Sequence, residues 1–180
     1  MKPRIISIDL ETYSDVDLGK CGVYRYVEGD FHILLFAYAF DDEAVEIIDM
    51  ASGETLPDEV LDAISDSEII KSAWNAAFER TCIGRMLGRT LYPDDWKCSM
   101  VWAASLSLPL ALKNAAAVLK TGEQKDRASP QRAWRRRGRR GGPCPLPCPR
   151  RRKGKQAPPP LWYIWKKIAR NLPFPRGKGP

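Results

Sequence analysis

The stretch RIISIDLETYSDVDLG, residues 4–19, places two carboxylates directly after an apolar run. The apolar run predicts a first strand over residues 4–10, buried on both sides. Because side chains alternate along a strand, Asp9 and Glu11 should point the same way, while Leu10 points to the core. A strand that ends on two neighbouring carboxylates is unusual, since the two charges repel each other.

A divalent cation removes that repulsion. Mg²⁺ and Mn²⁺ prefer oxygen ligands, and the end of a central strand is a rigid place to hold them. Two such ions, about 3.5–4 Å apart, can hold the attacking and leaving oxygens of a phosphodiester. Taken alone, the Asp-x-Glu pattern is common by chance and favours a strand that simply ends in a solvated acidic loop.

A second motif, AWNAAFERTCI at residues 73–83, also runs from a predicted strand into a predicted helix. Asn75 falls at the turn, and Phe78 and Glu79 follow within the first helical turn. The start of a helix exposes backbone N–H groups that suit a phosphate, and the side chain of Arg80 could reach an anion. The alternative is that Glu79 is a surface residue paired with a neighbouring arginine.

The spacing of apolar residues predicts the other elements. We expect an irregular stretch or short edge strand over 14–30, strands over 32–40, 44–50 and 67–75, and helices from residue 57 and over 76–88, 97–108 and 111–122. The second and third strands would pair as a hairpin, and Gly88 would end the helix that carries Glu79. A hairpin followed by alternating strands and helices indicates a mixed α/β layer.

The order of these blocks resembles the four-acid (DEDD) group of 3′→5′ proofreading exonucleases, which share a ribonuclease-H-like fold. SIDLET, residues 7–12, is similar to their first motif, and WNAAFER, residues 74–80, to their second. More narrowly, the chain resembles the N-terminal exonuclease region of family A DNA polymerases of phage and prophage type over about residues 4–126. The blocks that carry this narrower resemblance are residues 7–43, 75–82 and 106–119.

The resemblance implies two-metal hydrolysis of single-stranded DNA 3′ ends with Mg²⁺ or Mn²⁺. The catalytic acids and metal ligands would be Asp9, Glu11 and Glu79. The residues that contact DNA would be Thr12, Asn75, Phe78 and Arg80. In the family the second-motif acid is most often Asp, so Glu79 departs from the pattern. A polymerase domain follows the exonuclease in complete family members.

The family also has a third motif, a helix with Tyr or His and an Asp one turn later. Neither tyrosine after Glu79 is followed by Asp at that spacing, and no acid follows Asp126. The single histidine, His32, is predicted to lie at a strand edge, and Asp94 and Asp95 in a solvated turn or helix start. We therefore expect an α/β domain of ribonuclease-H-like type that is incomplete at its C-terminal end and has little or no nuclease activity alone.

The net charge of +7 averages two different regions. Residues 1–126 hold all 22 acidic residues and carry −10, whereas residues 127–180 carry +17 and 11 of the 15 prolines. These proportions divide the chain into a domain over 1–126, which the resemblance implies to be exonuclease-like, and a disordered tail over 127–180. The five scattered cysteines indicate free thiols, and the longest apolar run, 33–40, is too short to cross a bilayer. We expect a soluble, cytoplasmic protein without a signal peptide.

The tail has three interpretations. It could bind nucleic acid through its Lys/Arg clusters and aromatic residues. Residues 161–170, LWYIWKKIAR, could form a basic amphipathic helix on a membrane surface. We favour a third, a shifted reading frame, because GC-rich DNA read out of frame yields Arg, Pro, Gly and Ala with few acids. The rival function to a partial exonuclease is a non-catalytic nucleic-acid-binding protein that uses this tail, and an RNA-trimming relative is a further alternative.

Overall fold

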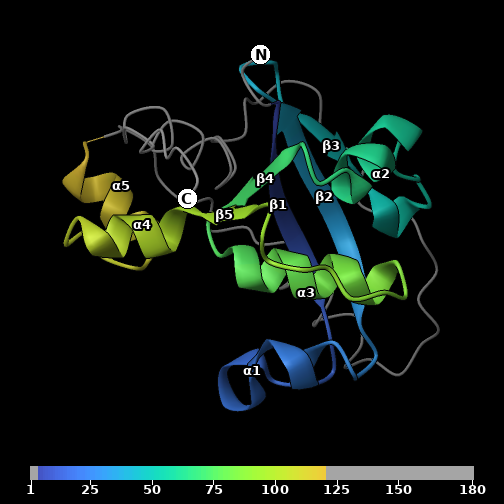
Figure 1. Ribbon diagram of the computed structural model, residues 1–180. Helices are drawn as coiled ribbons and strands as arrows, with labels where there is room; N and C mark the ends of the chain where they lie inside the picture. The colour runs from blue at the N-terminus through green and yellow to red at the C-terminus, as the bar shows by residue number, and fades with distance from the viewer. Residues whose placement is uncertain (1–3, 121–180) are drawn as a thin grey trace, which may run out of the picture.

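The computed structural model describes residues 4–120 as a five-stranded sheet with helices beside it (Figure 1). The strands are β1 (Ile5–Tyr13), β2 (His32–Phe40), β3 (Glu46–Ile48), β4 (Ile70–Ala73) and β5 (Trp96–Cys98). The helices are α1 (Leu18–Tyr26), α2 (Asp58–Ser65), α3 (Ala76–Met86), α4 (Ser99–Ser105) and α5 (Leu112–Val118), with a 3₁₀ turn, η1 (Met50–Ser52).

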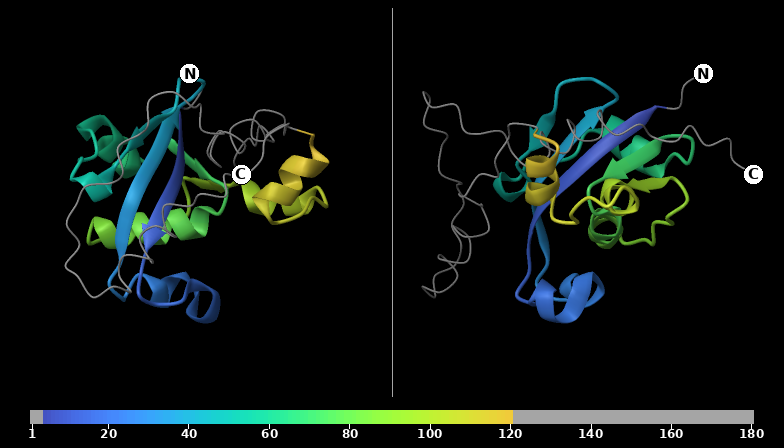
Figure 2. Two further views of the ribbon diagram at one scale, coloured as in Figure 1. Left: turned by 180° about the vertical axis from the view of Figure 1, so that it is seen from behind. Right: turned by 90° about the vertical axis from the view of Figure 1, so that its left-hand side faces the viewer.

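The sheet is mixed, with strand order β3-β2-β1-β4-β5. β1, β2 and β3 form an antiparallel meander, and β4 and β5 join it in parallel orientation beside β1. This arrangement confirms the predicted α/β class, with a mixed sheet flanked by helices. The turned views show α1 beyond the far end of the β1–β2 hairpin and α4 and α5 on the β5 side (Figure 2).

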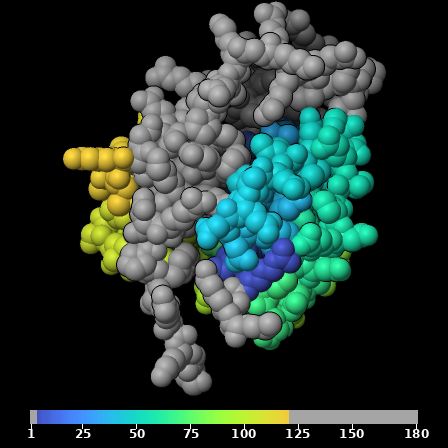
Figure 3. All heavy atoms as spheres, turned by 90° about the horizontal axis from the view of Figure 1, so that it is seen from above, coloured from blue at the N-terminus to red at the C-terminus, as the bar shows by residue number. Residues whose placement is uncertain are grey.

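One face of the sheet forms the main core. Ile6, Ile8 and Leu10 of β1 belong to this core, together with residues of β2, α2 and α3. Seen from above, the segment after β2 lies beside α2 at the surface (Figure 3). The helices α4 and α5 pack in a separate cluster around Ala115 and Ala116.

The first strand differs from its prediction in two ways. β1 continues to Tyr13, so Asp9 and Glu11 lie within the strand and not at its end. Its residues also alternate between buried and partly exposed, whereas burial on both sides was expected. The reason for the greater length is β2, whose antiparallel pairing with β1 extends to Tyr13.

The segment predicted as irregular or as an edge strand, residues 14–30, contains helix α1. Its start is capped by the carboxylate of Asp17, which accepts a hydrogen bond from the N–H of Gly19 at 2.9 Å. The helix is kinked at Gly22, where φ is 72° and ψ is 173°. Residues with positive φ are mostly glycine, which explains how two short helical pieces join at this position.

The prediction for α3 is confirmed, including its end at Gly88. Gly88 has a φ of 65°, and its N–H bonds to the carbonyl of Arg85. The N–H of Arg89 bonds to the carbonyl of Gly84 at 3.0 Å. These two bonds form a Schellman motif, which satisfies carbonyls at the end of the helix.

Most of the other predicted elements are present. β2 occupies the predicted range, β3 and β4 lie inside theirs, and α2 follows Pro57 directly. The helix predicted over 97–108 is instead the end of strand β5 followed by the shorter α4. The predictions for the tail, residues 127–180, lie outside the described residues.

Two predictions about cysteines and membranes concern the part of the chain that the structure describes. Cys21, Cys82 and Cys98 are free thiols, as expected. Between residues 4 and 120, no helix combines the length and apolar character that crossing a bilayer requires.

Candidate active site

Strand β1 presents Asp9 and Glu11 on the same face, as its alternation requires. Both side chains are partly exposed, while the intervening Leu10 and the following Thr12 are buried on the opposite face. Asp9 lies opposite Ala37 of β2.

A β-bulge lies in the β1–β2 ladder between Glu11 and Thr12. Glu11 pairs with Leu35 and Thr12 with Ile33, so β2 contributes one extra residue at this point. Bulges bend and twist a strand and are frequent beside functional sites, where they re-aim side chains. Here the bulge falls directly after the second carboxylate of the first motif.

Glu79 is brought to β1 by the short pairing between β1 and β4. β4 pairs with β1 only over Ile5–Ser7 and ends at Ala73, and α3 begins three residues later. Helix α3 contacts β1 as well as β4, and Glu79 on α3 is near enough to Asp9 on β1 to interact with its charge. The two sequence motifs therefore meet in the fold.

The carboxylate of Glu79 is in an unfavourable environment for a charge. Glu79 is 5% exposed, and its Oε2 has no hydrogen-bond partner among residues 4–120. Burial raises the pKa of Glu79 well above its ordinary value, and the nearby charge of Asp9 raises it further. Two carboxylates that interact in this way favour either a proton or a cation between them.

The donor set suits a hard cation. Asp9, Glu11 and Glu79 would offer carboxylate oxygens, which Mg²⁺ and Mn²⁺ prefer, and the unpartnered Oε2 of Glu79 is a ready ligand atom. Within residues 4–120, however, no three His, Cys, Asp or Glu side chains stand in a ready metal-binding arrangement. The residues thus fit part of a metal site and do not form a complete one.

Thr12 and Phe78 belong to one cluster behind the carboxylates. The hydroxyl groups of Thr12 and Tyr26 lie 3.0 Å apart in the buried interior. The ring of Tyr26 also lies 6.1 Å from that of Phe78 and 5.8 Å from that of Phe31. Tyr26 of α1 therefore links the first motif to the second, and it was missed because residues 14–30 were interpreted as irregular.

Asn75 and Arg80 occupy different surroundings. Asn75 precedes α3 at the N-cap position, and its side chain makes no capping bond to the helix. Arg80 donates from Nη1 to the carbonyl oxygen of Leu91 at 2.5 Å, on the side of α3 away from Glu79. Their predicted contacts with DNA stay predictions.

A second buried charge lies outside this site. The side chain of Lys71 on β4 is fully buried, and its Nζ donates to the carboxylate of Asp95 and to the carbonyl of Asp66. Asp94 and Asp95 lie in a turn, as predicted, and Asp94 is exposed. Asp95 is not fully solvated, because its carboxylate is the partner of a buried lysine. His32, by contrast, begins β2 at an exposed position, as expected.

Comparison with known proteins adds one relative. No protein-family model matches the chain. Over 126 residues the chain is 55% identical to the DNA polymerase of Bacillus phage SP02, a match that covers 69% of this chain and 19% of that polymerase. The chain thus spans about a fifth of the length of the curated relative it matches. Over that match it is similar to one part of a phage DNA polymerase.

Proposed function

We propose that residues 4–120 form part of a 3′→5′ exonuclease module of a DNA polymerase, with a ribonuclease-H-like fold. The observation that carries the proposal is the environment of Glu79. Its carboxylate is buried, its Oε2 has no hydrogen-bond partner among residues 4–120, and its pKa is raised by burial and by the charge of Asp9. The similarity to a phage DNA polymerase supports the same assignment. The substrate would be the 3′ end of single-stranded DNA.

Asp9, Glu11 and Glu79 would hold Mg²⁺ or Mn²⁺ in this module. When bound, the metal ions would stabilise the charge on the attacking and leaving oxygens of the phosphodiester. The carboxylates would orient the ions from two rigid elements, β1 and α3, which the core holds together. Thr12, Asn75 and Phe78 would shape the pocket for the terminal nucleotide.

The third motif of the family has no counterpart in this sequence, since no acid follows Asp126. We therefore propose that this chain binds metal weakly and hydrolyses DNA slowly or not at all by itself. The same proposal includes that, in complete proteins of the family, a polymerase domain follows this module in the same chain.

Titration of the full chain with MnCl₂ in a calorimeter tests the metal site. The wild-type chain should bind Mn²⁺, and Asp9→Asn and Glu79→Gln should each weaken binding severalfold, because each replaces a ligand carboxylate by an amide. Asp62→Asn, at an exposed position of α2, is the matched control and should leave binding unchanged. Equal Mn²⁺ binding by wild type and both site variants would refute the proposed site.

Digestion of a 5′-labelled single-stranded oligonucleotide with Mn²⁺ tests the activity. We expect little or no shortening from the 3′ end by the full chain. Efficient shortening that Asp9→Ala abolishes would show that the third motif is dispensable and would contradict the proposed inactivity. Shortening that survives Asp9→Ala would point to a contaminating nuclease.

A second candidate function is favoured by the charge of +17 on residues 127–180, which contain no acid. In this alternative the chain is a non-catalytic nucleic-acid-binding protein that uses the tail. Binding should then fall steeply with salt, because neutralising phosphates releases counterions. Deleting 127–180 should abolish binding, whereas a metal-dependent site in residues 4–120 would retain it when Mn²⁺ is present.

A further inference from the structure

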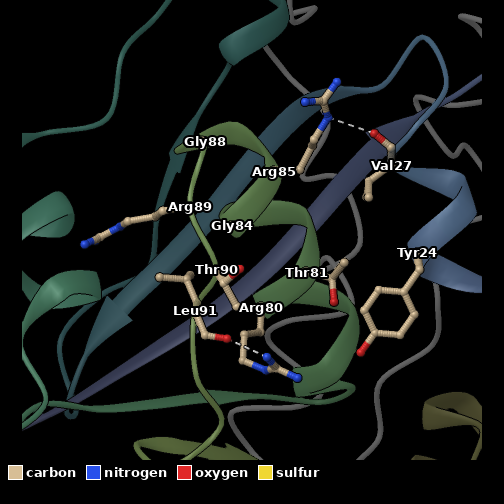
Figure 4. A pocket seen from close by; sticks show the side chains of 10 residues that line it. All are labelled: Tyr24, Val27, Arg80, Thr81, Gly84, Arg85, Gly88, Arg89, Thr90 and Leu91. Carbon is tan, nitrogen blue, oxygen red and sulfur yellow. Dashed lines mark hydrogen bonds between the residues drawn. The ribbon is translucent and has the colours of Figure 1, made fainter.

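A cavity of about 450 Å³ lies beside α3 (Figure 4). Its walls come from α1, from the outer side of α3 and from the segment after α3, residues 88–91. Thr81, Gly84 and Arg85 recur at helical spacing and share this side of α3, whereas Glu79 is buried on the other side with the core. The cavity is therefore separate from the carboxylate site.

Positive charge is concentrated around the cavity. The described residues that line it include Arg80, Arg85 and Arg89 and no Asp or Glu. None of the three arginines forms an ion pair with a carboxylate elsewhere in residues 4–120. Residues 4–120 hold ten Lys and Arg against 20 Asp and Glu, so three unpaired arginines around one hollow depart from the acidic character of this region.

Two of these guanidinium groups are held in place by the backbone. Arg80 donates to the carbonyl of Leu91 at 2.5 Å, and Arg85 donates from Nε to the carbonyl of Val27 at 3.0 Å (Figure 4). A guanidinium group has five N–H donors, so these bonds leave most donors available to a ligand. Anchored arginines also lose less conformational entropy when an anion binds. Arg89 extends away from the cavity toward Ser65.

An aromatic ring stands at the edge of the same cavity. Tyr24 of α1 is 68% exposed, and Thr81 lies between its ring and the floor of the cavity (Figure 4). Gly84 allows the segment after α3 to lie close against the helix, because a Cβ at this position would lie 2.8 Å from the carbonyl oxygen of Arg89. An exposed aromatic beside fixed arginines is the combination that binds bases by stacking and the backbone by its phosphates.

We propose that this cavity binds a single-stranded nucleic acid, with Arg80 and Arg85 on its phosphates and Tyr24 stacked on a base. The choice of DNA as the strand rests on the proposed function, but the cavity requires neither a metal ion nor Asp9 and Glu79. It would hold the strand on the outer side of α3, remote from the bond to be hydrolysed.

Arginine-specific footprinting of the full chain tests this proposal without interference from other basic segments. Phenylglyoxal modification would be followed at single residues by peptide mass spectrometry, in EDTA, with and without a short oligothymidylate. We expect the oligonucleotide to slow modification of Arg80 and Arg85 severalfold. Arg4, which pairs with Glu59 at 2.9 Å far from the cavity, is the internal control and should react at an unchanged rate.

Inorganic phosphate at the same total phosphate concentration separates a strand site from a small-anion site. Protection by the oligonucleotide and not by phosphate supports the proposal. Equal protection by both would overturn it in favour of a simple anion site. Unchanged modification of Arg80 and Arg85 with oligonucleotide would overturn it altogether, while leaving Mn²⁺ binding by the carboxylates to be judged by its own titration.

Substitution of Tyr24 tests the stacking contact. Tyr24→Ala should weaken the protection of Arg80 and Arg85 severalfold, whereas Tyr24→Phe should retain it because the ring remains. Tyr24 is largely exposed, so neither change disturbs the core. Full protection in Tyr24→Ala would overturn the assignment of the ring to a base.

Discussion

Lys71 and Glu79 lie on either side of the turn from β4 to α3, and both are buried. They differ in the partners that the chain provides for their charged groups. Lys71 is fully buried, and its ammonium group donates to the carbonyl of Asp66 and the carboxylate of Asp95. Glu79 is almost as buried, but its Oε2 has no hydrogen-bond partner and its pKa is raised. The charge of Lys71 is compensated within the fold, whereas that of Glu79 is compensated only in part, by a hydrogen bond to its own backbone.

This difference separates a charge that the chain pairs from one that it leaves largely unpaired. A buried charge is tolerated when the chain supplies its partners, and it costs stability when they are missing. Lys71 therefore fastens β4 to the segment before β5. The unpartnered Oε2 of Glu79 can bind a ligand from outside the chain. The same missing partner lowers the stability of the folded chain.

The largest effect is expected from Lys71→Met. The substitution leaves the carboxylate of Asp95 without its buried partner, and breaking a buried pair in this way costs about 3–5 kcal/mol of unfolding free energy. Urea denaturation of the full chain would measure it. Lys97→Met, at an exposed position of the neighbouring β5, is the matched control and should change stability little. Equal stability of the two variants would show that the buried pair of Lys71 and Asp95 does not stabilise the fold.

Asp95→Asn should have a smaller effect of the same sign. Its side chain is 22% exposed, and Lys71 keeps its bond to the Asp66 carbonyl, so we expect a loss of about 1–3 kcal/mol. The double variant with Lys71→Met, compared with the two single variants by denaturation, measures the coupling between the pair. Strictly additive losses would mean that Asp95 does not compensate the lysine.

Glu79→Gln should have the opposite sign. Because burial and Asp9 raise the pKa of Glu79, ionising it costs stability. The unfolding free energy of the wild-type chain should therefore fall as pH rises above the ordinary value of 4.5 and through the raised pKa of the folded state. In Glu79→Gln this part of the fall should disappear, which makes the variant more stable than wild type at pH 7.

Thermal denaturation across a pH series would show this. Glu68→Gln, at an exposed position, is the matched control and should reproduce the wild-type profile. A Glu79→Gln variant that is less stable than wild type at pH 7 would mean that the chain does compensate this carboxylate.

The smallest effect is expected from Mn²⁺ on the wild-type chain. A ligand that binds only the folded state stabilises it by about 1.4 kcal/mol at tenfold excess over Kd. The rise in denaturation midpoint should be clearly smaller in Glu79→Gln and persist in full in Lys71→Met. An equal rise in both variants would place the metal elsewhere.

Sequence patterns predicted most of the helices and strands, because these elements have strong local patterns of apolar residues. The apolar run of β2 and the apolar spacing of α3, which ends at Gly88, do not depend on distant residues. Helix α1 was missed because its sequence is mostly polar and a glycine kink divides it, so no apolar period emerges. Because α1 was not predicted, Tyr26 was not recognised as the residue that links the two motifs.

The environment of each charge was beyond sequence reasoning. Alternation along β1 correctly placed Asp9 and Glu11 on one face. Their relation to Glu79 depends on the parallel pairing of β1 with β4, which a pattern along the chain does not specify. The burial of Lys71 likewise depends on Asp95, 24 residues later, and no local signal distinguishes that carboxylate from a solvated one.

Because of the bulge opposite Glu11 and Thr12, β2 should tolerate the loss of a residue at one position and not at others. Leu34 is the residue in excess, so Ile33 still faces the same side as Phe36 although they are three apart. A deletion at Leu34 would preserve the facing of both neighbours. A deletion between Phe36 and Phe40 would instead turn one part of the strand over. Length variation in this hairpin is therefore expected at the bulge, beside the carboxylates, and not in the remainder of β2.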